Sequence, residues 1–157
     1  MNWTWMGVTL AAHLVSLTIL AGGAVGAIVM HMALSAAVRR SAAEASALAG
    51  TMLRFALTAQ IGAVLMLLTG VGLLAERQWA DWGRPWLMVK LALFVLLVLA
   101  GPIIARPAGA SLREALAAGG SNVAGVAGAL RRLTLFHAVQ KAGLIAIIVL
   151  AVLRPGA

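Results

Sequence analysis

Three histidines and two lysines are the side chains of this sequence whose types and positions suit chemistry in an apolar setting. His13 and His31 lie 18 positions apart, which is five whole turns of an α-helix, so both imidazoles would leave one helix on the same face. The helical rise places them about 27 Å apart, one near each end of the helix. His137 shares the expected depth of His31, and Lys90 shares that of His13. The sequence therefore predicts two polar pairs at opposite ends of a bundle.

Neutral imidazoles that project from helices into an apolar interior are the usual axial ligands of b-type haem. The candidate ligands of haem b or of a metal ion are His13, His31 and His137. Lys90 is the candidate catalytic residue, as a charge partner or proton donor, and Lys141 or Arg131 would neutralise the haem propionates. A haem at either depth would pass electrons to a quinone or a porphyrin.

Other arrangements of the same residues stay open. Adjacent helices pack about 8–10 Å apart, so His31 and His137 would sandwich one haem only from diagonal positions, and ligation by one histidine or by His and Met is equally compatible. A neighbouring hydroxyl or carbonyl would satisfy His13 or His137 in a purely structural role, and both lysines would reach the surface by extending their stems. The methionines suit packing better than copper ligation. Paired carboxylates, a Ser-His-Asp order and a phosphate loop are absent from the sequence, so we expect no hydrolytic chemistry.

The composition requires these residues to lie in a membrane protein. Of the 157 residues, 63% are hydrophobic and 10% are charged, which leaves too few polar side chains to cover a soluble globule. Four apolar stretches are each near the roughly 20 residues that cross a bilayer. They predict a single domain, an all-α, up-down-up-down, four-helix integral membrane bundle. The expected spans are about 6–34, 55–75, 85–105 and 133–153.

Capping and breaking signals place the helix ends. Ser41-Ala-Ala-Glu44 has the spacing of a capping box and predicts that the second helix begins near Ala42, outside the membrane. We expect the third helix to end at Arg106-Pro107, because proline removes a backbone donor. A second capping-box spacing, Ser111-Leu-Arg-Glu114, predicts a short surface helix within residues 108–130. Docking of this segment onto another protein stays open.

The cationic and aromatic residues agree on an orientation. The first and third connections carry seven arginines, Arg39, Arg40, Arg54, Arg106, Arg113, Arg131 and Arg132. The positive-inside rule places these connections in the cytoplasm and both termini outside it. All five tryptophans fall at the N-terminus or in the second connection, as one interfacial belt: Trp3, Trp5, Trp79, Trp82 and Trp86. The net charge of +8 is thus a signal of topology and does not indicate nucleic-acid binding.

Small residues on the first span favour close helix packing. Gly22 and Gly26 have GxxxG spacing, and Gly62, Gly70 and Gly72 offer similar positions on the second span. The GxxxG face would serve either packing inside one bundle or a homo-oligomer seam.

Short motifs in a fixed order carry a family resemblance. They are His13 followed by Gly22-Gly23, Met52-Leu-Arg54-Phe, Leu68-Thr-Gly70-Val-Gly72-Leu, Trp86-Leu-Met-Val-Lys90-Leu and Ala151-Val-Leu-Arg154-Pro155. The chain resembles the uncharacterised, predicted four-span bacterial integral membrane proteins related to HemJ-type protoporphyrinogen oxidases and, more distantly, to CopD-type copper resistance membrane domains. The resemblance implies a bacterial inner-membrane location, b-type haem, roles for His13 and Lys90, and oxidation of protoporphyrinogen. The chain lacks the tyrosine and arginine of the HemJ-type first span.

Three functional hypotheses follow from these observations. The leading hypothesis is a haem-b-binding membrane redox protein with histidine ligands inside the bundle, which would be an oxidoreductase if it is an enzyme. The second is a non-enzymatic accessory subunit or scaffold that uses its glycine faces for association. The third is copper handling by His and Met, which ranks lowest because the sequence has no Met-x-x-Met or His-rich cluster.

Overall fold

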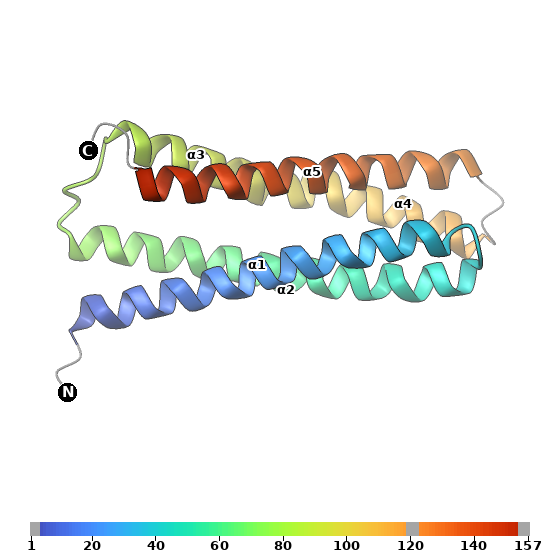
Figure 1. Ribbon diagram of the computed structural model, residues 1–157, viewed down its shortest axis with the longest axis horizontal. Coiled ribbons are helices and arrows are strands. Elements are labelled where there is room, and N and C mark those ends of the chain that lie inside the picture. The colour runs from blue at the N-terminus through green and yellow to red at the C-terminus, as the bar shows by residue number, and fades with distance from the viewer. Residues whose placement is uncertain (1–3, 119–122, 154–157) are drawn as a thin grey trace.

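The computed structural model of the chain describes residues 4–118 and 123–153, and the regular structure in this part is helical. Four helical stretches are long and apolar enough to cross a membrane. Figure 1 shows α1 and α2 side by side, with α5 alongside the α3–α4 helix, and the start of α1 at the same end as the end of α5. The elements are α1 (Trp5–Ala37), α2 (Ala42–Glu76), α3 (Pro85–Ala100), the π-helical η1 (Gly101–Ala105), α4 (Arg106–Ala117) and α5 (Val123–Leu153).

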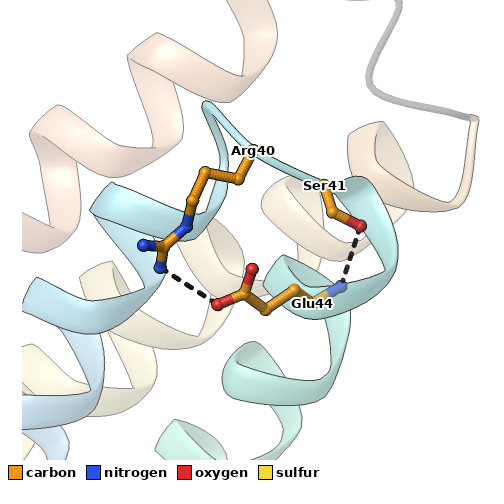
Figure 2. A network of polar contacts seen from close by, with 3 residues as sticks. All are labelled: Arg40, Ser41 and Glu44. Carbon is orange, nitrogen blue, oxygen red and sulfur yellow. Dashed lines mark hydrogen bonds and ion pairs between the residues drawn. The ribbon is translucent and has the colours of Figure 1, made fainter.

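The cap predicted at the start of the second helix is confirmed. Ser41 is the N-cap of α2, and its hydroxyl accepts a hydrogen bond from the backbone N–H of Glu44 at 3.4 Å (Figure 2). The Glu44 carboxylate accepts a hydrogen bond from Arg40 at 3.0 Å instead of reaching back to the Ser41 backbone. The serine half of the capping box is therefore present, and an ion pair replaces the glutamate half.

The predicted end of the third helix is wrong. The helix continues through η1 into α4 and reaches Ala117, so Ser111 lies inside a helix and caps nothing. The π-helical turn explains the continuation, because the backbone N–H of Arg106 bonds to the carbonyl of Gly101, five residues earlier. The wider turn accommodates Pro102 and Pro107, which lack the N–H groups that a regular helix needs. The predicted break at Gly119-Gly120 lies outside the described residues.

The helices are longer than a bilayer is thick. α1 has 33 residues and α2 has 35, which correspond to about 50 Å against about 30 Å of hydrocarbon. We call the end formed by the α1–α2 turn, the end of α4 and the start of α5 the arginine end. A core of small and aliphatic side chains fills this end, including Leu34, Ala45, Leu112, Val126 and Leu133. The helices therefore stay packed together toward this end.

The opposite end carries the tryptophans that the structure describes. Trp5 begins α1, Trp79 and Trp82 lie between α2 and α3, and Trp86 is in the first turn of α3. We call this the tryptophan end. The described tryptophans group at this end, and most of the described arginines lie toward the other, with Arg77 and Arg84 as the exceptions, as the sequence led us to expect.

Glycines bring α1 and α2 into close contact, at Gly26 and Gly62 as predicted and at Gly23 in place of Gly22. A Cβ atom on Gly23 would lie 2.8 Å from the Cα atom of Ala59, and one on Gly62 would lie 2.7 Å from the Cα atom of Leu20. Gly26 packs against the Phe55 ring of the same chain, whereas a Cβ on Gly22 would have no neighbour within 4 Å. The close approach therefore serves the α1–α2 pair.

Candidate functional site

His31 of α1 and His137 of α5 meet near the arginine end. Their ring centroids are 5.2 Å apart at an interplanar angle of 49°, and each residue is only 6% exposed. The depth argument predicted this pair from sequence, and the structure brings the two rings into contact. Two imidazoles buried together in an apolar bundle are unusual unless their nitrogens are used.

Hydrogen bonds fix the tautomer of His31. The Thr134 hydroxyl donates its single proton to the carbonyl of Leu130 at 3.0 Å, so its oxygen acts as acceptor toward the His31 Nε2 atom at 2.9 Å. Nε2 of His31 therefore carries the proton, and Nδ1 carries a buried lone pair. That Nδ1 atom has no hydrogen-bond partner within the described residues.

His137 is left with both ring nitrogens unpartnered in the described part of the chain. Gln140 lies close by, one turn further along α5, and makes no well-formed hydrogen bond with the ring. A buried polar atom without a partner raises the free energy of the folded state by about 1–3 kcal/mol. Three such nitrogens lie in one place, where the described residues leave their hydrogen-bonding capacity unused.

A cavity of about 500 Å³ borders His137. Its walls come from all four long helices and from the π-helical turn, and they are mostly Ala, Leu, Gly and Phe side chains. Ala24, Ala59 and Phe94 belong to the apolar core beneath it. The polar side chains that line the cavity are Gln60, Arg106, Arg113, His137 and Gln140. Apolar walls with a few convergent polar groups are typical of a ligand site.

Arg106 is positioned by a contact between helices. Its guanidinium donates a hydrogen bond to the side-chain oxygen of Gln60 on α2 at 2.7 Å. The chain has four acidic residues, all in the described part, and the two ion pairs there join Arg40 to Glu44 and Arg77 to Asp81. Arg106 therefore keeps an uncompensated positive charge at the cavity.

A second polar group lies toward the tryptophan end. The His13 Nδ1 atom is 2.8 Å from the hydroxyl of Thr69, which donates to the Leu65 carbonyl at 2.8 Å, so Nδ1 of His13 donates and Nε2 carries the lone pair. Lys90 lies near enough to interact electrostatically with His13, and its ammonium is 5.2 Å from the centroid of the Trp86 ring. His13 and Lys90, which the sequence placed at one depth, thus both lie toward the tryptophan end.

The chain matches one sequence family over most of its length. The sequence model of a family described as predicted integral membrane protein, DUF2269, matches residues 8–155. The chain belongs to this DUF2269 family. The membership agrees with the four apolar helices and confirms a multi-pass integral membrane protein of the kind expected. No curated protein and no solved structure matches the chain. The proposed link to HemJ-type and CopD-type proteins therefore gains no support beyond the motifs.

The cations at the cavity differ from those that the sequence suggested. Lys141 and Arg131 are exposed on α5, and neither lines the cavity. Arg106 and Arg113 line it instead, although their sequence positions suggested only a topological role. Their spacing of seven residues would have placed both on one helix face, but only if the helix were continued through Pro107.

Proposed function

We propose that this integral membrane protein binds b-type haem in the cavity, with His137 as the protein ligand of the iron. The observation that carries the proposal is the burial of His137 at the cavity wall with both nitrogens unpartnered. A neutral imidazole of this kind is the common protein ligand of haem iron. The cavity volume falls within the range of about 300–1,000 Å³ that small-molecule sites occupy.

The residues fit ligation by one histidine and do not fit a bis-histidine site. The rings of His31 and His137 are in contact, which leaves no gap for a macrocycle between them, and Nε2 of His31 is bonded to Thr134. His13 lies toward the other end of α1 and cannot contribute to the same site. Of the three predicted ligands, His137 alone lines the cavity.

His31 has a positioning role in this proposal. A metal-bound histidine usually donates its second ring N–H to an acceptor that fixes its tautomer. The lone pair on Nδ1 of His31 is such an acceptor beside His137, and the His31–Thr134–Leu130 hydrogen bonds hold it in that state. If His137 donated one ring N–H to Nδ1 of His31, its other ring nitrogen would keep a lone pair for the haem iron.

Bound haem would supply one-electron redox chemistry, with a quinone or porphyrin as the partner substrate. Any proton transfer at the tryptophan end would fall to His13 and Lys90, because the Nε2 lone pair of His13 would accept a proton and the Lys90 ammonium would donate one. The protein would then be a membrane oxidoreductase similar to HemJ-type protoporphyrinogen oxidases.

The spectrum of the detergent-purified protein after haem addition tests the proposal. Once unbound haem is removed, we expect the Soret band and reduced b-type peaks of histidine-ligated haem for the wild type, loss of this ligated spectrum for His137→Ala, and its retention for the matched variant His13→Ala. His31→Ala should keep the haem but shift its spectrum, because His137 would lose the acceptor for its second ring N–H. A wild type without a Soret band, or a His137→Ala variant with an unchanged one, would overturn the proposal.

We also propose an up-down-up-down topology in the bacterial inner membrane, with the arginine end in the cytoplasm and both termini outside. Because the chain has no cysteine, single cysteines report the orientation without background. A membrane-impermeant maleimide should label Trp82→Cys in intact spheroplasts and Ala43→Cys only after lysis. Both residues are exposed in the folded chain. The reverse labelling pattern would invert the orientation.

A non-enzymatic accessory role is the second candidate, and one observation favours it. Gly22 leaves an open strip on the outer face of α1, with the exposed Val25 nearby, where another helix could approach closely. A protein that stays colourless, and whose partner binding survives replacement of its three histidines by Leu, would support this role. Copper handling is less favoured, because no group of three or more His, Asp or Glu side chains gathers in the described residues.

A further inference from the structure

The cavity combines an apolar body with a cationic rim. Most of its wall is aliphatic or aromatic, whereas Arg106 and Arg113 contribute two positive charges from one face of α4. Seven residues separate the two arginines, so they lie two helical turns apart and differ by only about 20° around the helix. Both arginines are exposed at the rim, so an acidic group of a ligand could reach their charges while its apolar body lies against the wall.

The hydrogen bond between Arg106 and Gln60 orients the guanidinium without neutralising it. An amide oxygen is a neutral acceptor, so the positive charge remains available, and one edge of the planar group is held. A guanidinium fixed along one edge presents its remaining N–H donors to a planar anion, which is the geometry that carboxylates accept in pairs.

The position along the bundle sets how such a ligand lies. The arginines of α2, of the continuous α3–η1–α4 helix and of α5, including Arg54 and Arg132, lie in the halves of these helices nearest the arginine end. The apolar wall at Ala63, Phe94 and Leu144 belongs to the core cluster nearer the membrane centre. A ligand with an acidic group toward the headgroups and an apolar body in the hydrocarbon matches both parts.

We infer that Arg106, positioned by Gln60 and assisted by Arg113, binds the carboxylate of an amphiphilic ligand whose apolar ring body occupies the cavity. The inference rests on the proposed haem function and extends it to the acidic side chains of the ring. It also applies to a porphyrin without iron, because the arginine contact does not involve the metal. The carboxylate, and not the iron, then sets which way round the ring enters.

Three probes separate the contributions: haem, its dimethyl ester, which lacks the carboxylate charges, and metal-free protoporphyrin. Binding of each to the full-length protein in detergent is followed by the Soret band or by porphyrin fluorescence. The variant is Arg106→Gln, and the matched control is Arg132→Gln, which removes an exposed arginine outside the cavity. Arg113→Gln serves as a second variant, and thermal unfolding shows that each variant is folded.

We expect the wild type to bind haem about tenfold or more tightly than the ester, as the loss of a charged hydrogen bond predicts. Arg106→Gln should weaken binding of haem and of metal-free protoporphyrin by a similar factor and leave ester binding unchanged. Arg132→Gln should bind all three probes like the wild type.

The outcomes distinguish this inference from the proposed function. The carboxylate contact would be overturned if the wild type bound haem and the ester equally, or if Arg106→Gln and Arg113→Gln bound haem like the wild type. The haem proposal would survive either result if the spectrum of bound haem still depended on His137. Binding of metal-free protoporphyrin that depends on Arg106, without ligation of haem by His137, would keep the inference and overturn the proposed function. A wild type that binds none of the three probes would overturn both.

Discussion

Gly23→Leu is expected to destabilise the folded protein by at least about 3 kcal/mol, the upper end for overpacking a core. The reason is steric, because a Cβ at this position would lie 2.8 Å from both the Cα atom of Ala59 and the carbonyl oxygen of Phe55. Both are backbone atoms, which cannot rotate away as a side chain can. The α1–α2 pair would have to separate along its length to admit the leucine.

Gly22→Leu is the matched control for this prediction. It makes the same chemical change one residue earlier on α1, at a site where a Cβ has no neighbour within 4 Å. Leucine also has a higher helix propensity than glycine, by roughly 0.5–1 kcal/mol, so Gly22→Leu should be neutral or slightly stabilising. The measurement is the midpoint of thermal unfolding in mild detergent. Equal midpoints for the two variants would show that the helices do not meet at Gly23.

The sequence alone predicts the four apolar helices and one cap well, for physical reasons. Span length follows from bilayer thickness, and a serine with a glutamate three residues later satisfies backbone donors at a helix start. The same spacing at Ser111 fails, because local pattern does not show whether a helix has already begun. The expected stop at Pro107 fails because a π-helical turn lets the helix pass two prolines.

The candidate site was predictable only in part. Helical periodicity and depth were enough to pair His31 with His137, since both depend on regular helix geometry. The role of Arg106 depends on a contact with Gln60, 46 positions away in the sequence, and on a cavity whose walls come from several helices. Packing that brings distant residues together has no local pattern. The prediction for Gly26 is confirmed, but Gly23 replaces Gly22 for the same reason, because the helix face that meets α2 is set by the partner.

Three unpartnered nitrogens lead to a second large effect, a gain of stability on removal of a site residue. His137→Leu should stabilise the ligand-free protein by about 2 kcal/mol, because it replaces two unsatisfied buried nitrogens by an apolar side chain of similar size. For a chain of this length, that free energy corresponds to an increase of several degrees in the unfolding midpoint, at about 2–4 °C per kcal/mol.

His13→Leu is the control, and it should have the opposite sign. His13 is half-buried and donates a hydrogen bond to Thr69, so its replacement loses an interaction of about 1 kcal/mol. The comparison separates a binding residue from a packing residue, since a histidine retained for structure would lower the midpoint when it is replaced. Addition of haem sharpens the contrast, because a ligand that binds only the folded protein raises its midpoint, and it should raise that of the wild type more than that of His137→Leu, which lacks the iron ligand. A lower midpoint for ligand-free His137→Leu than for the wild type would show that His137 holds the bundle together, and its open nitrogens would then have no functional meaning.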